Sequence, residues 1–367
     1  MGGPPPARRP SSGRLPVTAS TTLARMSADP GSGVTTARAT LAEVAERAGV
    51  SISTVSKVLN GRSGVSQSTR TKIEALLSDH RYNPRNPGPN HAPLIEVLCY
   101  EIDSWWSSEA LASIERVARR RGVGVVVSGT SDRQQPDAGW IEGVLSRRPV
   151  GAVLVSSNLQ PAQLQQLRSR NIPFVMLGPT GDVPPEVPTI GSADWSGAYA
   201  AARHLIELGH REIAIVTGPE DMMAATARLS GFRAALDAAG LDLRKEHLRR
   251  AEFHHVDGIE QGRHLLTLTH RPTAVFAASD VLALGVYEAA RAMKVAIPSQ
   301  LSVVGFDDVR VAQWAGPALT TVRVPIAEMA AQAVELVLGV REGGLDATRI
   351  DMATTLVLRE STAPPGG

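Results

Sequence analysis

The N-terminal organisation of this chain is decided by residues 40–84, which read TLAEVAERAGVSISTVSKVLNGRSGVSQSTRTKIEALLSDHRYNP. Apolar side chains recur at helical spacing between Leu41 and Ala48, and Thr40 with Glu43 forms a capping box at the start of this segment. Gly49 follows the last periodic residue, which is typical of a helix end. The stretch therefore begins with a short helix.

Two more short helices are expected in the same stretch. Ser51 can cap the first of them, in which Val55 and Val58 form an apolar side. Ser66 can cap the next, in which Ile73 and the leucines after it face inward. Three short helices, with a tight turn after the first, predict a helix-turn-helix.

The second helix of a helix-turn-helix lies in the major groove, and its first residues meet the base edges. Lys57 can reach a guanine edge or a phosphate, Ser53 can donate or accept a hydrogen bond, and Ile52 can press on a thymine methyl group. The residues placed to anchor phosphates near the third helix are Arg62, Ser66, Thr69 and Arg70. The alternative is a three-helix scaffold whose serines only cap helices and whose Lys57 is solvated.

The segments on either side of the helix-turn-helix have the composition of extensions and linkers. Residues 1–38 are rich in Pro, Gly, Ser and Thr and carry five arginines against one aspartate, so we expect a basic, disordered extension. Residues 85–93 contain three prolines and a glycine, which predicts a linker without a helix. We therefore place the DNA-binding domain at 39–84 and a large domain at 94–363.

The large domain alternates buried strands with amphipathic helices, the pattern of a doubly wound α/β fold. The first series of strands is expected at residues 94–100, 123–128, 152–156 and 174–177. The second series is expected at 213–217, 274–278 and 302–306, with helices at 197–208 and 281–293. Two successive parallel sheets imply two lobes, with a ligand in the cleft at the carboxyl ends of the strands.

Composition and motifs exclude several other classes. A single cysteine, Cys99, lies within an apolar run and forms no disulfide within the chain, which fits a reducing cytoplasm. No run of about 20 apolar residues spans a membrane, and the N-terminus lacks the apolar core of a signal peptide. No phosphate-binding loop, nucleophile elbow or His/Cys metal cluster is present, so we expect neither an enzyme nor a cofactor.

Residues 40–84 closely resemble the DNA-binding headpiece of the lactose-repressor/galactose-repressor family of transcription factors. The resemblance continues through the segments that begin DWSGAYAAARHL at Asp194, TARLSGFRAAL at Thr226, ASDVLALGVYEAA at Ala278 and IPSQLSVVGFDD at Ile297. It implies a transcriptional repressor of carbohydrate-metabolism genes, with a core like a periplasmic sugar-binding protein. The operator contacts that we expect come from Thr40, Ser51, Ile52, Ser53, Thr54, Lys57, Asn60, Ser66, Thr69, Arg70 and Tyr82.

The resemblance also implies a carbohydrate site in the cleft. Its residues would be Trp106, Asp194, Arg228, Phe253, Ser279, Asp280 and Asp307. The chemistry fits independently, because carboxylates accept hydrogen bonds from vicinal hydroxyls, an arginine donates to sugar oxygens, and aromatic faces pack on sugar C–H surfaces. For Asp280 a helix N-cap role is also expected, and either Trp105 or Trp106 could instead close the core.

The chain departs from the family pattern at the linker. Family members carry a hinge helix there, with a leucine that enters the minor groove, whereas this chain has His91 at that place and prolines at 87 and 89.

The resemblance further implies a dimer or tetramer on a roughly palindromic operator in the cytoplasm, at the nucleoid. Residues 326–340 and 109–119 would lie at the dimer face. The alternatives are a regulator that uses a nucleobase corepressor and a solute-binding protein.

Overall fold

The computed structural model describes residues 2, 41–59, 64–79, 93–133, 136, 138–181, 183–339 and 349–366. The predictions for Thr40, Asn60, Arg62, Tyr82, the linker before Pro93 and the N-terminal extension other than Gly2 lie outside the described residues. No described helix is both long enough and apolar enough to cross a bilayer.

The N-terminal part contains the three predicted helices, α1 (Leu41–Ala48), α2 (Ile52–Leu59) and α3 (Gln67–Asp79). Gly49 has a φ of +71°, which lets the backbone turn sharply between α1 and α2. The buried apolar side chains that join the three helices are Val44, Ala45, Ala48, Val55, Val58, Ile73 and Leu77. This small core fixes the angle at which α2 is presented.

The first lobe is built on a six-stranded sheet whose neighbouring strands are all parallel. In spatial order, its strands are β11 (Arg349–Met352), β5 (Thr189–Ser192), β4 (Phe174–Leu177), β3 (Gly151–Val155), β1 (Leu94–Tyr100) and β2 (Gly124–Thr130). Its helices are α4 (Trp105–Arg120), α5 (Ala138–Arg147), α6 (Pro161–Ser169) and α11 (Ile326–Gly339).

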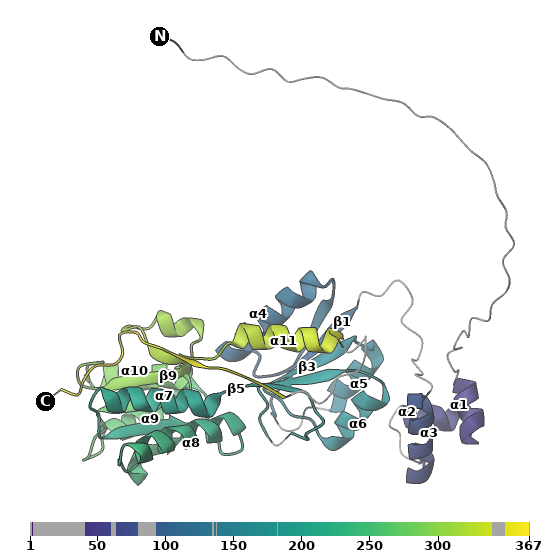
Figure 1. Ribbon diagram of the computed structural model, residues 1–367, viewed down its shortest axis with the longest axis horizontal. Coiled ribbons are helices and arrows are strands. Elements are labelled where there is room, and N and C mark those ends of the chain that lie inside the picture. Colours follow the sequence, from purple (N-terminus) through teal and green to yellow (C-terminus); the bar gives the residue numbers. More distant parts are fainter. Residues whose placement is uncertain are drawn as a thin grey trace.

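The second lobe repeats this architecture (Figure 1). In spatial order, its strands are β12 (Thr355–Val357), β10 (Thr320–Arg323), β9 (Ser302–Asp307), β8 (Ala274–Ala277), β6 (Ile213–Thr217) and β7 (Leu248–Arg250). The pair β10–β12 is antiparallel and the others are parallel. Its helices are α7 (Asp194–Glu207), α8 (Met223–Ala238), α9 (His255–Leu266) and α10 (Asp280–Ala292).

The two sheets are not successive along the chain, which corrects the order expected from the sequence. After β10 the chain returns to the first lobe, where α11 packs against α4 and β11 pairs with β5, and it then enters the second lobe again as β12. Figure 1 shows α11 beside α4 and away from the helices of the second lobe. Several chain crossings therefore join the lobes, which suits a hinged pair.

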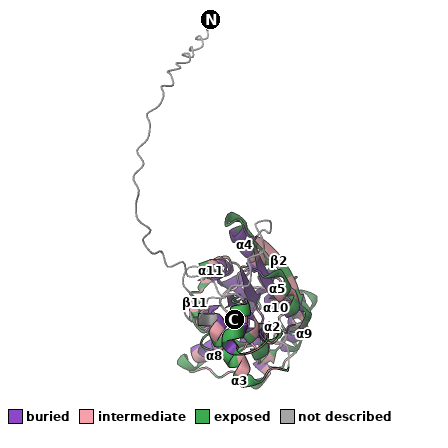
Figure 2. Cartoon of the chain, turned by 90° about the vertical axis from the view of Figure 1, so that its right-hand side faces the viewer, coloured by how far each residue is buried: buried purple, intermediate pink, exposed green. Residues whose placement is uncertain are grey.

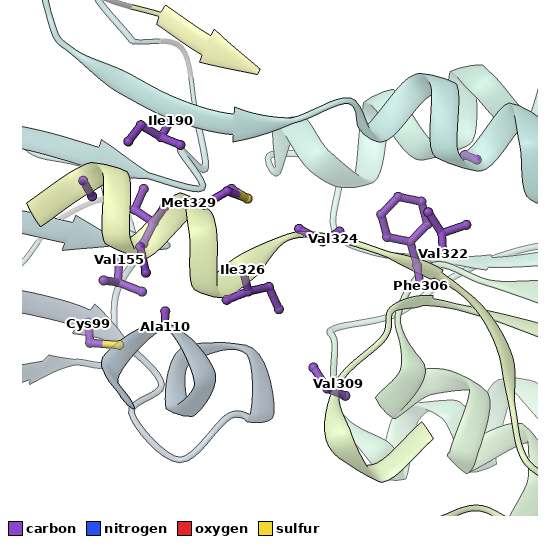
Figure 3. Close-up of a cluster of buried hydrophobic side chains, with 14 of the residues drawn as sticks. Cys99, Ala110, Val155, Ile190, Phe306, Val309, Val322, Val324, Ile326 and Met329 are labelled. Carbon is purple, nitrogen blue, oxygen red and sulfur yellow. The ribbon is translucent and has the colours of Figure 1, made fainter. Parts of the chain in front are cut away.

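One hydrophobic core cluster extends through these crossings. Figure 3 shows Cys99 and Val155 of the first lobe, Phe306 of the second, and Val324 and Ile326 on the crossing segment among the same group of buried side chains. Figure 2 shows the buried segments inside a partly exposed outer layer of helices. The core therefore lies beneath the region where the two lobes meet.

Candidate functional site

A cavity of about 360 Å³ opens between the lobes. Residues that follow the carboxyl ends of the strands line it from both sides, among them Glu101 after β1, Ser156 after β3 and Ser279 shortly after β8. Parallel sheets expose their ligand sites at these ends. Of the seven residues predicted for the ligand site, six line this cavity, namely Trp106, Asp194, Arg228, Phe253, Ser279 and Asp307.

Arg228, from α8, holds the inner end of the cavity together. Its Nε donates to Asp194 Oδ1 at 2.7 Å, its Nη1 donates to the Ala278 carbonyl at 2.6 Å, and its Nη2 lies 3.1 Å from Asp307 Oδ1. Its Cζ lies 3.9 Å from the centroid of the Phe306 ring, a cation–π distance. These contacts fix the guanidinium against the cavity wall, and the Arg228 residue is only 6% exposed.

Asp307 carries a buried carboxylate oxygen that faces Arg228 in the cavity. The residue ends β9 with a φ of +105°, a backbone conformation uncommon for aspartate. Its Oδ1 is at ion-pair distance from Arg228 but is not aligned for a hydrogen bond, and it has no other hydrogen-bond partner among the described residues. Burial raises the pKa of Asp307 to about 7. A ligand hydroxyl could satisfy this oxygen.

Asp280 does not belong to the cavity, which corrects the prediction made from the ASD segment. It is fully buried, and its carboxylate accepts hydrogen bonds from the Val309 N–H at 2.8 Å and from the Thr321 hydroxyl. Burial raises its pKa well above the usual range. The expected N-cap role also falls on its neighbour, because Ser279 Oγ accepts from the Leu282 N–H. Asp280 instead fastens the Val309 segment, which lines the cavity.

Aromatic side chains form much of the remaining wall. Trp106 packs over Gly178, where an added Cβ would lie 3.0 Å from the indole, and Phe253 packs over Gly218, where an added Cβ would lie 2.3 Å from the ring. Trp105 and Trp195 also line the cavity, whereas the sequence favours Trp106 over Trp105 for stacking on a ligand and gives no prediction for Trp195. The signal for Trp195 was its place next to Asp194, directly after a strand and a short turn.

The charge of the lining is predominantly negative. The carboxylates are Glu101, Asp194, Glu252, Asp307 and Asp351, and the guanidinium groups are Arg228 and Arg349. Because like charges repel in a partly desolvated cleft, an anionic ligand is disfavoured. The cavity therefore suits a neutral ligand that carries hydroxyl groups.

Contacts across the cleft hold the lobes together on its rim. Arg133 of the first lobe donates to both carboxylate oxygens of Asp221, at 3.1 and 2.8 Å, and to Glu252 at 3.1 Å. Glu101 of the first lobe lies 2.9 Å from His254 Nε2 of the second. Ionic contacts thus bridge the two lobes across the cleft.

The start of α2 forms a polar surface with one exposed apolar side chain. Ser51 caps the helix, since its Oγ accepts from the Thr54 N–H at 3.2 Å, and it also contacts the hydroxyls of Ser53 and Thr54. Ile52 is 53% exposed, and Ser53 and Lys57 are exposed. An exposed isoleucine has no packing role in this small domain, so it is available to a partner.

The start of α3 is built in the same way. Ser66 Oγ accepts from the Thr69 N–H at 3.3 Å and contacts the Thr69 hydroxyl at 2.7 Å. Arg70 lies one residue further along the helix and is partly exposed. Together, the two capped N-termini present backbone N–H groups and hydroxyls, as expected where a helix-turn-helix meets phosphates.

Comparisons with known proteins agree with both parts of the molecule. Residues 40–85 match the model of bacterial regulatory proteins of the lacI family, and residues 202–362 match that of a periplasmic binding protein-like domain. The HTH-type transcriptional repressor PurR of Proteus mirabilis (strain HI4320) is 31% identical over 335 residues, which are 89% of this chain and 97% of that protein. The repressor CytR of Escherichia coli (strain K12) is 31% identical over 83% of this chain and 90% of its own length.

Solved structures show the same arrangement. A transcriptional regulator CelR–cellobiose complex is similar with a TM-score of 0.66 and 30% identity, over 88% of this chain and 100% of that one. The lac repressor dimer bound to operator and the anti-inducer ONPF is similar with a TM-score of 0.65 and 27% identity, over 89% and 100%. A regulator from Enterococcus faecium with bound ribose gives 0.66 and 26%, over 74% and 100%.

Proposed function

This chain belongs to the LacI family of bacterial regulatory proteins, and from that membership we propose that a small neutral carbohydrate, bound between its lobes, controls its affinity for operator DNA. The family resemblance and the predicted fold class are confirmed. The protein is a DNA-binding transcription regulator and not an enzyme. The ligand, its effect and the contact residues are the proposal.

The observation that carries the proposal is the buried Oδ1 of Asp307, which among the described residues has only the guanidinium of Arg228 as a charged partner and lies beside Asp194 in the cavity. Carboxylates accept from hydroxyl groups and the guanidinium donates to ring or hydroxyl oxygens, so vicinal hydroxyls match the pattern. The negative lining disfavours sugar phosphates and nucleotides. A neutral nucleobase that acts as corepressor is the alternative, since aromatic walls also accept planar rings.

We further propose a homodimer that places two helix-turn-helix units on a roughly palindromic operator at the nucleoid. The faces of α4 and α11 that do not pack into the first lobe form the dimer surface in this proposal. The lac repressor dimer among the similar structures supports a two-fold assembly. Sugar binding would stabilise the closed lobes and thereby favour a headpiece arrangement with lower operator affinity.

Titration calorimetry with the full chain tests the ligand class. A panel of neutral saccharides, the corresponding sugar phosphates and free nucleobases separates the classes by charge and shape. We expect binding of a neutral saccharide that Asp307→Asn weakens at least about tenfold, a loss of about 1.4 kcal/mol. Asp237→Asn, at an exposed site on α8, is the matched control and should bind as the wild type does. Binding of a nucleobase alone would replace the carbohydrate proposal with the corepressor alternative.

A further inference from the structure

The cleft has two chemically different ends. At the inner end, the side chains of Asp194, Arg228 and Asp307 are 7–13% exposed and polar. Other lining residues are Trp105, which is 41% exposed, and Trp195, which is 44% exposed. A side chain that lines a cavity and is also more than two-fifths exposed lies where that cavity opens. The polar groups therefore lie at the bottom and the two tryptophans lie at the mouth.

We propose that Trp105 and Trp195 form a second sugar subsite, so that the effector is a saccharide of at least two rings. This inference rests on the proposed carbohydrate function and adds the size of the ligand. One ring would meet Asp307 and Arg228 at the inner end, and the next ring would pack its C–H face on the tryptophans. Glu101 and Glu252, which also line the cavity, would accept from its hydroxyls.

The distribution of tryptophan supports this subsite. The chain has only five tryptophans, and Trp105, Trp106 and Trp195 all line this one cavity. Large exposed aromatic surface is unfavourable in water and, next to a cavity, marks a binding surface. A single ring bound to the inner carboxylates would leave the two outer indoles uncovered. A second ring would bury them.

Contacts with neighbouring residues hold the outer indoles in place. Trp195 stacks on Tyr199 with ring centroids 5.3 Å apart and an interplanar angle of 15°. Its backbone is fixed by α8, because an added Cβ on Gly231 would lie 2.1 Å from the Trp195 carbonyl oxygen. Trp105 meets Trp314 of the second lobe edge to face, at 6.3 Å and 79°. Rigid aromatic platforms lose little entropy on binding, which favours stacking.

The size of the cavity agrees with this assignment. Its volume of about 360 Å³ falls within the range of about 300 to 1,000 Å³ that is typical of pockets for drug-sized ligands. The mouth tryptophans come from different lobes, since Trp105 begins α4 and Trp195 lies in the first turn of α7. A ligand long enough to contact both tryptophans would therefore join the two lobes and favour their closure.

The test compares each monosaccharide with its own disaccharide. We would titrate the full chain with glucose, cellobiose and maltose, with galactose and lactose, with xylose and xylobiose, and with cytidine and adenosine. We expect a disaccharide to bind at least about tenfold more tightly than its monosaccharide. Trp105→Ala and Trp195→Ala should weaken the disaccharide about tenfold or more, as for other tryptophan anchors, and should change the monosaccharide less than about twofold.

Phenylalanine at either position should restore most of the disaccharide affinity, because it keeps an aromatic face. Leu358→Ala, at an exposed apolar site away from the cavity, is the control and should have no effect. A monosaccharide that binds as tightly as its disaccharide would overturn this inference and leave the carbohydrate function intact. A nucleoside that binds while no saccharide does would overturn both.

Discussion

Asp307 Oδ1 lies 3.1 Å from Arg228 Nη2 at the inner end of the cleft, which is an ion-pair distance. This oxygen nevertheless has no aligned hydrogen-bond donor among the described residues. Arg228 is already committed to Asp194 and to the Ala278 carbonyl, so it neutralises Asp307 only in part. Burial accordingly outweighs the guanidinium and raises the pKa of Asp307 to about 7. This carboxyl group is therefore poised to change charge near neutral pH when a ligand arrives.

The first prediction concerns pH. Ligand hydroxyls donate to the ionised carboxylate, so effector affinity should increase by up to about tenfold between pH 6 and pH 8 as Asp307 loses its proton. The stability of the free protein should change in the opposite direction. A folded-state pKa above the usual value of about 3.9 stabilises the protein at low pH, and this contribution is lost as pH rises through about 7.

Calorimetry at several pH values measures the effect, and Asp307→Asn isolates it. Other groups nearby also titrate, since burial raises the pKa of Asp280 and the Glu101 hydrogen bond raises the pKa of His254. Loss of the His254 proton weakens the contact with Glu101 and so opposes the expected trend. If Asp307→Asn retained the full pH dependence, Asp307 would not be its source.

The second prediction concerns the contacts of Arg133 across the cleft. Arg133→Gln removes the charged contacts to Asp221 and Glu252, whose carboxylates are about half exposed and remain solvated. We expect effector affinity to fall about three- to tenfold because the closed state becomes less populated, with less than about 1 kcal/mol lost from unfolding stability. X-ray scattering of the ligand-free Arg133→Gln variant should show a larger radius of gyration than that of the wild type, because its two lobes lie further apart.

Arg119→Gln is the matched control for this experiment. It breaks a pair with Glu115 on the surface of α4 that does not cross the cleft. Its effector affinity should equal that of the wild type. Equal affinities of the Arg133 and Arg119 variants would show that the rim contacts do not contribute to closure.

The third prediction concerns the DNA-binding surface of α2. Ile52→Ala and Lys57→Ala change exposed side chains, so the headpiece should keep its fold. Each should weaken binding to the cognate operator by about 1–3 kcal/mol and change the preference at one base pair. Arg70→Ala, on α3, removes a positive charge that we expect to contact a phosphate and should weaken all sequences alike. Competition binding with single-base operator variants distinguishes the two behaviours.

The fourth prediction concerns a buried ion pair within the first lobe. Arg147 of α5 donates two hydrogen bonds to Glu96, which is fully buried in β1 and also accepts from Ser128. Arg147→Met leaves this carboxylate without its partner and should cost about 2–4 kcal/mol of unfolding free energy, less than a fully buried pair because Arg147 is partly exposed. Denaturant unfolding measures the loss.

The double variant Glu96→Leu with Arg147→Met provides the comparison. Replacing both partners with apolar side chains removes the unpaired charge, so the double variant should be more stable than Arg147→Met alone. A double variant that is less stable would show that the charges themselves stabilise the lobe.

Much of the fold could be predicted because local patterns and tertiary structure agree. The strands β1, β4 and β6 begin and end where their apolar runs do, and the capping serines of α2 and α3 mark those helix starts. The return of α11 and β11 to the first lobe was missed. No local signal encodes it, because α11 is an ordinary apolar helix whose partner, α4, lies about two hundred residues earlier.

Some residues of the ligand site could be predicted and others could not, again because local patterns do not encode long-range packing. Asp307 ends β9, a strand-end position that points to the cleft, whereas Arg228 lies on α8 in a segment that was recognised by its resemblance to the family. Asp280 has an equivalent strand-end position, but its carboxylate turns to Val309 and Thr321, a choice set by long-range packing. Trp195 was missed because a helical tryptophan beside small residues has the pattern of core packing, whereas the structure leaves it partly exposed at the cleft.

The central claim is that a neutral saccharide controls operator binding, and fluorescence anisotropy on labelled DNA from upstream of the coding sequence tests it most directly. The purified full chain would be titrated at fixed salt, with and without each saccharide. We predict tight, sequence-specific binding that one saccharide releases, and Asp307→Asn should need at least about tenfold more of that saccharide for the same release. Specific binding that no saccharide changes, or that a nucleobase strengthens, would contradict the carbohydrate control proposed here.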